Sequence, residues 1–243
     1  MTTLTRSQEV AAVLRTEILR RQYRVGERLP SERDLAARFE TNRGAIREAL
    51  KQLEQLGIIE IQPGGARVVP TEEATLEVLG YLLNLDGQPN PKLIDDYLLV
   101  FKMFCVMSAE NSVTNATAEQ RLFISSVIAK MRKDPSDREL MREGWTELFT
   151  YFLTINDNLV MHLISNGLKA QLLAQVTDLD PAGDLDEKKI AKILSAMNKA
   201  VKNEDAKLMG ECVGQYFDWV RETIAIALSN LNITLSKQAA FGS

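Results

Sequence analysis

The sequence predicts a mainly α-helical protein, with a small N-terminal domain that also holds two short strands and an all-α C-terminal bundle of about seven helices. Three observations support this prediction. The chain has 243 residues, which is more than one modest domain usually needs. Apolar residues recur at helical spacing along most of the chain. A run of β-forming residues around a Pro-Gly-Gly turn occurs at residues 58–69, and residues after 92 show helical periodicity alone.

The composition is that of an ordinary soluble globular protein, with 45% hydrophobic and 26% charged residues. The start MTTLTRSQEV lacks the apolar segment of a signal peptide, and no apolar run approaches the ~20 residues that span a bilayer. We therefore expect a cytoplasmic protein without a membrane partner. Cys105 and Cys212 stand alone in apolar helical settings, which predicts packed thiols in a reducing compartment.

The N-terminal domain, residues 1–69, is predicted element by element. A helix is expected at about 5–23 from its apolar spacing. Ser31 follows Pro30 as the cap of a short second helix, and Asn42 caps a third helix that Gly57 ends. Pro63-Gly64-Gly65 then turns one strand into the next. A short helix, a tight turn, a longer helix and a two-stranded wing together predict a winged helix-turn-helix.

The third of these helices has the chemistry of a DNA-reading helix. Arg43 and Arg47 lie four residues apart and share one face in its first turns, the part that enters a major groove. Arg43 is unfavourable at a helix N-terminus unless a polyanion binds there. The predicted contacts with double-stranded DNA also include three small or polar neighbours, two cations for flanking phosphates and two wing glycines: Asn42, Gly44, Ala45, Arg33, Arg67, Gly64 and Gly65.

At these residues the chain resembles the GntR superfamily of bacterial transcription regulators. The likeness runs through Leu29 to Arg33, Leu35-Ala36, Arg43 to Leu50, Leu53, Gly57 and Gly64. Glu40 stands where the family usually has a turn glycine. The resemblance implies a DNA-binding regulator that acts as a homodimer on a pseudo-palindromic operator.

The charge distribution fits two different domains. Residues 1–70 carry 12 Lys or Arg against 9 Asp or Glu, and the remainder carries 17 against 24, so that a net +3 and a net −7 give the overall −4. A weakly basic head and an acidic body predict that only the head holds DNA.

The rest of the chain is predicted as a linker, a helical domain and a tail. Residues 70–91 form the linker, with a connecting helix at 72–85, and residues 233–243 form a frayed tail. Residues 92–232 form the helical domain. Its helices are expected at about 92–112, 117–132, 136–155, 158–176, 187–202 and 204–231, with capping boxes at Thr117–Gln120 and Ser136–Glu139 and an acidic loop at 178–186.

This body resembles the effector domain of the FadR subgroup within that superfamily, through Leu93-Ile94-Asp95, the stretch 158–169 and Gly214. Many relatives bind a metal there through one aspartate and three histidines. This chain has one histidine, His162, so we expect no metal and no cofactor. The resemblance implies a small-molecule effector, such as a fatty acyl-CoA, that weakens DNA binding. The expected effector-binding residues are Phe101, Lys102, Phe149, Tyr151, Gly214, Tyr216 and Trp219.

Three alternatives stay open at this stage. The first is a ligand-independent or architectural DNA-binding protein. The second is a regulator that senses another small metabolite without a metal. The third alternative is an enzyme with an attached DNA-binding head, but the sequence offers no nucleophile-base pair, phosphate loop or metal set. We therefore expect a regulator without catalytic activity.

Overall fold

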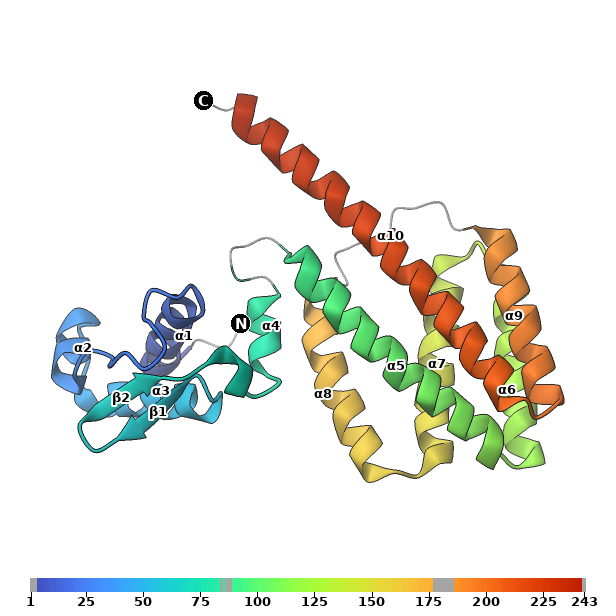
Figure 1. Cartoon of the computed structure of the whole chain (residues 1–243), viewed down its shortest axis with the longest axis horizontal. Coiled ribbons are helices and arrows are strands. Elements are labelled where there is room, and N and C mark those ends of the chain that lie inside the picture. The colour runs from blue at the N-terminus through green and yellow to red at the C-terminus, as the bar shows by residue number, and fades with distance from the viewer. Residues whose placement is uncertain (1–3, 84, 86–88, 177–185, 242–243) are drawn as a thin grey trace. The chain divides into compact units, whose positions relative to one another are not determined.

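The chain divides into two units, Met1–Asn90 and Pro91–Ser243, and each unit has its own hydrophobic core. The computed structural model describes residues 4–83, 85, 89–176 and 186–241, without the side chains of 172–176 and 230–241. Figure 1 labels the elements of both units. Within the described part of the chain, no helix combines the length and apolar character that crossing a bilayer requires.

The N-terminal unit consists of short helices and one hairpin: α1 (Arg6–Leu19), α2 (Glu32–Arg38), α3 (Arg43–Gln55), β1 (Ile59–Gln62), β2 (Gly65–Val68), the 3₁₀ turn η1 (Thr71–Glu73) and α4 (Val78–Leu82). A capping box between Thr5 and Gln8 starts α1. The helix ends before the expected Tyr23, because Arg21 takes a left-handed conformation with φ of 58°. The winged helix-turn-helix order is thus confirmed.

The core of this unit lies between α1, α2, α3 and the hairpin. Its largest fully buried side chains are Leu14, Leu35, Ile46, Leu53 and Ile58. The α3 positions among them are the apolar face that the sequence predicts. Burying that face leaves the opposite side of α3 exposed to solvent.

The wing is a two-stranded antiparallel hairpin in which Ile59 pairs with Val68 and Gln62 with Gly65. Residues 26–29 extend it along the other edge of β2, because Leu29 N donates to Ala66 O at 2.9 Å and Val68 N donates to Glu27 O at 3.0 Å. The hairpin is therefore anchored to the segment that enters α2.

The connecting helix expected at 72–85 is wrong in extent. The structure has η1, an extended Ala74 with ψ of 160°, and the five-residue α4. Thr75 N donates to Leu56 O at 2.9 Å, and a Cβ on Gly57 would lie 3.1 Å from Ala74 Cα. The backbone at 73–75 thus packs against the end of α3, which interrupts the helical run that the apolar spacing suggested.

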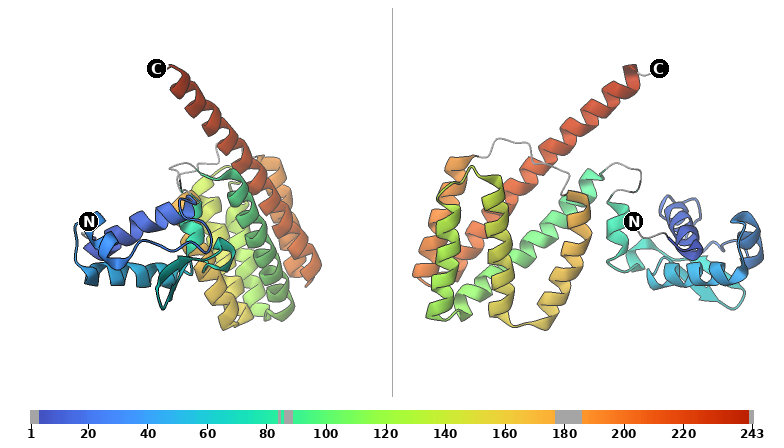
Figure 2. Two further views of the ribbon diagram at one scale, coloured as in Figure 1. Left: turned by 60° about the vertical axis from the view of Figure 1, so that its left-hand side comes forward. Right: turned by 180° about the vertical axis from the view of Figure 1, so that it is seen from behind.

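The C-terminal unit is all helical, as Figure 2 shows from two further sides. Its described helices are α5 (Pro91–Asn115), α6 (Ala118–Met131), α7 (Arg138–Asn156), α8 (Leu159–Val176), α9 (Glu187–Lys202) and α10 (Ala206–Phe241). The seventh expected helix corresponds to α4, which belongs to the N-terminal unit. The acidic loop expected at 178–186 lies almost wholly outside the described residues.

The first residues of α6 and α7 show whether the two predicted capping boxes form. Thr117 and Gln120 form the box that starts α6. Ser136 is not a cap, since Asp137 accepts from Leu140 N at 3.0 Å and α7 begins after it. The Ser136 backbone instead donates to Asp134 Oδ1 at 3.1 Å. Asp137, as a better-placed acceptor, takes the capping position.

Helix α10 packs along α5, and Gly210 leaves space for a side chain of α5. A Cβ on Gly210 would lie 2.0 Å from Glu110 Oε1, so a side chain there would displace the Glu110 carboxylate. The helix expected to end near residue 231 instead continues to Phe241. The tail expected at 233–243 is therefore helical as far as residue 241, and residues 242–243 lie outside the described residues. The sequence 231–241 holds no glycine or proline that would stop a helix.

Candidate nucleic-acid interface and aromatic cluster

Helix α3, hereafter the recognition helix, begins with a side-chain cap that fixes its first turn. Asn42 Oδ1 accepts from Ala45 N at 2.9 Å, as the sequence predicted for an N-cap. A Cβ on Gly44 would lie 3.0 Å from that same oxygen, so glycine leaves the cap its space. The end of the helix that faces outward is thereby rigid and carries only small residues beside its cations.

The turn between α2 and the recognition helix contains Glu40 in a left-handed conformation, with φ of 49°. Thr41 N donates to Ala36 O at 3.0 Å and closes this turn. A left-handed residue is where glycine is least costly, which explains why the family resemblance has glycine at this position. Glu40 adopts the same left-handed conformation, which is strained for a residue with a Cβ atom.

The two predicted base-reading arginines differ in their surroundings. Arg43 is the first residue of the recognition helix and is exposed, and among the described residues no carboxylate pairs with it. Arg47 is also exposed, with a side chain 64% accessible, but its Nε donates to both oxygens of Glu32 at 2.8 and 3.0 Å. Glu32 thus holds the second arginine in place from α2.

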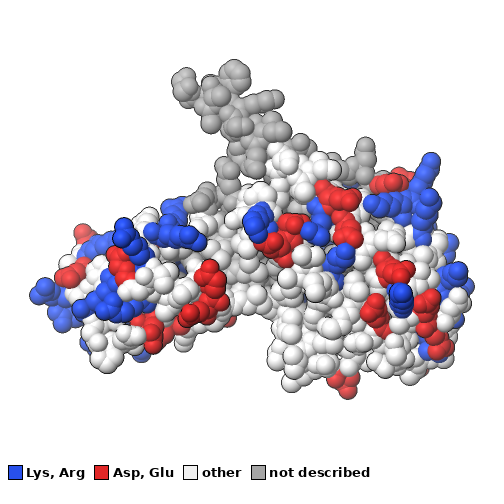
Figure 3. Space-filling model, in the orientation of Figure 1, with Lys and Arg blue, Asp and Glu red and all other residues white. Residues whose placement is uncertain are grey.

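The predicted phosphate contacts come from the elements before and after the recognition helix, α2 and β2. Arg33 is 78% exposed and lies 3.5 Å from Asp34, whose pKa is lowered chiefly by the Ser31 hydroxyl and less by Arg33. Arg67 is exposed on β2, and its Nη1 donates to Gly26 O at 2.9 Å. In Figure 3, Lys and Arg side chains gather over the end of the N-terminal unit that carries α2.

The wing tip shows one cation that the sequence analysis missed. Gly64 and Gly65 have φ of 111° and 125°, so both need the freedom of glycine. A Cβ on Gly65 would lie 2.6 Å from Arg28 Nε, whereas Gly64 faces open space. Arg28 therefore lies against the tip of the wing. The backbone pairing of residues 26–29 with β2 puts it there, and no local sequence pattern indicates that pairing.

An aromatic cluster lies in the C-terminal unit, where α5, α7 and α10 meet. Trp145 stacks on Tyr216 at 3.8 Å between ring centroids and on Phe149 at 5.5 Å. Phe217 lies at 5.5 Å from the Phe149 ring and at 5.6 Å from Phe101. Hereafter the aromatic cluster means Phe101, Trp145, Phe149, Tyr216, Phe217 and Trp219, and four of these were expected at the effector site.

The cluster contains a buried donor without a partner. Trp145 is 4% exposed. Among the buried side-chain nitrogen and oxygen atoms of the described residues, its Nε1 alone has no hydrogen-bond partner. Leaving an indole N–H unpaired costs free energy unless something accepts from it. Burial also raises the pKa of the neighbouring Tyr216 hydroxyl. Trp145 was not singled out from the sequence, although its spacing to Phe149 is helical.

Tyr151 does not join this cluster. Its ring lies 4.2 Å from that of Phe123 on α6, and both border a surface groove of about 400 Å³ with three α7 threonines. Thr150 lines the same groove. The helical period of α7 turns position 151 away from 145 and 149, which explains the difference.

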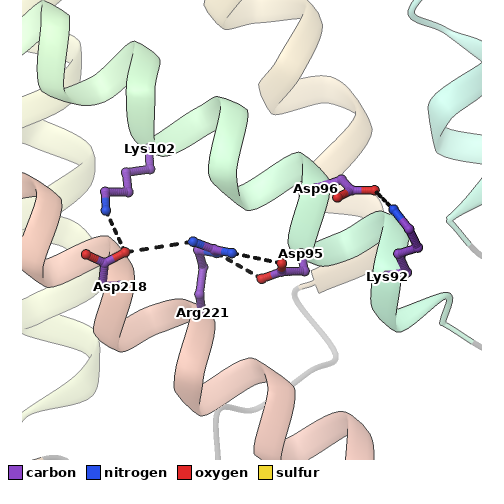
Figure 4. A network of polar contacts seen from close by, with 6 residues as sticks. All are labelled: Lys92, Asp95, Asp96, Lys102, Asp218 and Arg221. Carbon is purple, nitrogen blue, oxygen red and sulfur yellow. Dashed lines mark hydrogen bonds and ion pairs between the residues drawn. The ribbon is translucent and has the colours of Figure 1, made fainter.

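Lys102 and Gly214 lie together between α5 and α10. Lys102 Nζ contacts Asp218 Oδ1 at 2.6 Å, and Arg221 binds Asp95 through Nε and Nη2 at 2.9 and 2.8 Å (Figure 4). A Cβ on Gly214 would lie 3.5 Å from Lys102 Cε. The hydrogen bonds from Arg221 lower the pKa of Asp95. The Lys102 ammonium is thus already neutralised within this network.

The described residues contain no group of three or more His, Cys, Asp or Glu side chains that could hold a metal ion. Cys105 and Cys212 are both buried free thiols, and burial raises the pKa of Cys212 to about 11 and that of Cys105 further. The two cysteines are therefore packed side chains, and their burial disfavours the nucleophilic thiolate form.

The N-terminal geometry defines the protein's class: a winged helix-turn-helix with a capped recognition helix whose arginines face outward is a DNA-binding domain. The comparisons give the family of this domain. Residues 6–69 match the family model of bacterial regulatory proteins of the gntR family, and this domain belongs to it.

Relatives match over part of their length. The Probable transcriptional regulator PhnF of Escherichia coli (strain K12) is 40% identical over 91 residues, which is 37% of this chain and 35% of that protein. A Fatty acid metabolism regulator protein of Haemophilus influenzae (strain PittEE) is 27% identical over 146 residues, 59% of each chain. This chain thus spans about a third to three fifths of these relatives.

One solved structure supports the fold as a whole. It is described as that of Lar, which controls the expression of the agr system of Listeria monocytogenes. It covers 95% of this chain and 100% of its own, with a TM-score of 0.53 and 13% sequence identity. At that identity the likeness concerns the fold alone.

Proposed function

We propose that the protein is a transcription regulator that binds double-stranded DNA as a homodimer, with two recognition helices on a pseudo-palindromic operator. The observation that carries this proposal is the exposed pair Arg43 and Arg47 on the capped first turns of α3. A dimer spaces such helices one DNA turn apart, about 34–36 Å. The family of the N-terminal domain supports the proposal. The chromosome of a bacterium lies in its cytoplasm, where such a protein acts.

Base reading by the arginines is tested by substitution. Arg43→Ala and Arg47→Ala are each expected to cost about 1–3 kcal/mol of affinity for DNA selected from a random-sequence pool, and to relax base preference. Arg142→Ala serves as the matched control, since Arg142 is 65% exposed and paired with a glutamate in the C-terminal unit. Fluorescence anisotropy with selected and random DNA measures both effects. An equal loss of affinity for the selected and the random DNA would show that the arginine contacts phosphates and does not read bases.

We also propose that the C-terminal unit binds a largely apolar small molecule in the aromatic cluster and that a fatty acyl-CoA is the first candidate. The unpaired Trp145 Nε1 supports a ligand with a hydrogen-bond acceptor beside its apolar part. The relative named as a fatty acid metabolism regulator supports an acyl chain. Lys102 and Gly214 lie at the edge of this region and remain proposed contacts.

The ligand acts by favouring one conformation of the protein. A ligand that binds the DNA-incompetent state more tightly shifts the population toward it and lowers operator affinity by the same coupling free energy. Tyr151 keeps a place in this proposal only through the surface groove that it shares with Phe123.

Ligand binding is tested by thermal stability and tryptophan fluorescence. Palmitoyl-CoA is expected to raise the melting temperature by mass action and to change the emission of Trp145, whereas coenzyme A alone leaves both unchanged. Trp145→Phe is expected to weaken this response, with Tyr81→Phe on α4 of the N-terminal unit as the control. A ligand-independent DNA-binding protein shows no stabilisation with any metabolite, and palmitate without coenzyme A distinguishes the chain from the thioester.

A further inference from the structure

Helix α5 exposes a stripe of large apolar side chains that no described element of its own unit covers. Leu99, Val100, Met103 and Met107 are between 41% and 65% exposed. Positions 100, 103 and 107 follow one another at spacings of three and four, which is the spacing of a helix–helix seam. Lys102, the one charged residue at positions 97–109, turns toward Asp218 on α10 and leaves the stripe uncharged.

Helix α8 exposes a second set of apolar side chains. Leu159, Val160, Leu163 and Ile164 are between 44% and 71% exposed, while Met161 and Leu168 on its other side are buried. Lys169 is the one Asp, Glu, Lys or Arg among its 18 residues. The apolar residues of α8 therefore extend well beyond its buried side, and an apolar helix face is normally covered.

A hydrogen bond ties the two helices together near both sets. Tyr97 OH on α5 donates to Leu168 O on α8 at 2.9 Å, and the Tyr97 side chain is buried. In Figure 3 the part of the C-terminal unit over α8 and the adjoining stretch of α5 shows a broad area without charged side chains. We call these eight residues of α5 and α8 the α5–α8 face.

The size of this face is that of a protein–protein interface. Together its eight side chains expose on the order of 900 Å² per copy, so two copies would bury roughly 1,800 Å², within the ~1,200–2,000 Å² of specific stable interfaces. Monomeric soluble proteins rarely leave more than a few hundred Å² of contiguous apolar surface uncovered.

We propose that the α5–α8 face docks against the same face of a second copy across a twofold axis, and that this contact forms the dimer on which the proposed function rests. A twofold contact presents one patch to itself, so an uncharged apolar face meets an equal one without unpaired charges. The N-terminal unit offers no such match in its described residues, because its exposed large apolar side chains are scattered along the chain, with at most one in any helix or strand: Leu4, Val13, Val25, Ile61, Leu76 and Tyr81.

The experiment compares two variants of the face with a matched control in the full-length chain. Leu163→Glu alters α8 and Met103→Glu alters α5, while Leu122→Glu alters an equally exposed leucine on α6, at 72% against 60% for Leu163. Sedimentation equilibrium at micromolar concentration measures the association of the 27.2 kDa chain. Circular dichroism checks that each variant keeps its helix content, which is expected for side chains outside the core.

The wild type and Leu122→Glu are expected to sediment as dimers. Leu163→Glu and Met103→Glu are each expected to weaken association by on the order of 100-fold or more, because each buries two unpaired carboxylates. A monomeric wild type, as would follow if the N-terminal unit of the same chain covered the face, overturns the proposal. So do variants that remain dimeric, a loss by only one of them, or an equal loss in Leu122→Glu.

The outcome is separable from the proposed function. A monomeric, folded Leu163→Glu chain should still bind DNA that contains a single half-site, because its recognition helix is unchanged. Loss of dimerisation with retained half-site binding supports both proposals. An intact dimer in the two variants with normal operator binding refutes the α5–α8 face alone, and a wild-type dimer that binds no DNA refutes the proposed function alone.

Discussion

Glu32, the first residue of α2, accepts from Arg47 Nε of the recognition helix through both of its carboxylate oxygens, at 2.8 and 3.0 Å. The contact orients one of the two arginines proposed to read bases, in the absence of DNA. It also places a negative charge beside the surface that is proposed to meet phosphates. The two effects oppose each other in DNA binding, and substitution separates them.

Replacing Glu32 by Gln should release Arg47 and remove a charge that repels phosphate. We expect several-fold tighter binding to random DNA and a smaller gain on selected DNA, so that the ratio between them falls. Glu9→Gln, which removes an exposed partner of Arg6 on α1, is the control and should change neither. Weaker binding of Glu32→Gln to both DNAs would show that orientation of Arg47 outweighs repulsion.

Replacing Glu40 by Gly should stabilise the N-terminal unit. Glu40 has φ of 49°, a conformation that costs a non-glycine residue about 1–2 kcal/mol, and the added chain entropy of glycine offsets about half of that. We therefore expect a gain of about 0.5–1 kcal/mol in urea unfolding. Glu48→Gly, in the middle of the recognition helix, should instead lose about 1 kcal/mol. A loss at both positions would contradict the strain at the turn.

The wing glycines should separate stability from DNA contact. Gly64→Ala and Gly65→Ala both place alanine at positive φ, so each is expected to cost about 1–3 kcal/mol of stability. Only the Cβ at position 65 displaces Arg28, so Gly65→Ala should lose DNA affinity to the extent that Arg28→Ala does. Anisotropy titrations at several salt concentrations measure this. Equal affinity losses in the two glycine variants would show that Arg28 makes no contact.

The ion pair between Asp95 and Arg221 should contribute pH-dependent stability to the C-terminal unit. Hydrogen bonds from Arg221 lower the pKa of Asp95 in the folded protein, so the unfolded chain takes up the proton first as the pH falls. The contribution is therefore fully present above the unfolded value, about 3.9, and is lost as the pH falls through the lower folded value.

Asp95→Asn tests this contribution. Because both side chains are partly exposed, we expect the variant to lose about 0.2–1 kcal/mol at pH 7, near the upper end for a two-point contact. The difference from the wild type should shrink below about pH 4, as measured by urea unfolding across pH. Asp96→Asn, which removes the exposed partner of Lys92 on the same helix, is the control. A difference that persists undiminished at pH 2.5 would assign the loss to packing.

The sequence predicted the N-terminal unit well because its determinants are local. Asn42 as a cap, Gly57 at a helix end and the Pro63-Gly64 turn each act within a few residues, and each is where the structure has it. The connecting helix failed for the opposite reason. Its apolar spacing is helical, but the Thr75 backbone N–H donates a hydrogen bond to the carbonyl of Leu56, and no local pattern indicates that contact.

The site residues that the sequence could predict are likewise those whose positions depend on local structure. Arg43 and Arg47 could be found because their spacing alone puts them on one helix face. Glu32 and Arg28 could not, since each reaches its partner through the tertiary fold. In the C-terminal unit, four expected aromatic residues lie in one cluster, but the separation of Tyr151 from them and the inclusion of Trp145 depend on helix rotation and packing.

The two units keep separate hydrophobic cores, and this has a consequence for their evolution. A substitution that repacks one core leaves the other intact, so natural selection can reshape the C-terminal unit without rebuilding the DNA-binding domain. Lineages can thereby join one inherited DNA-binding domain to many different C-terminal domains.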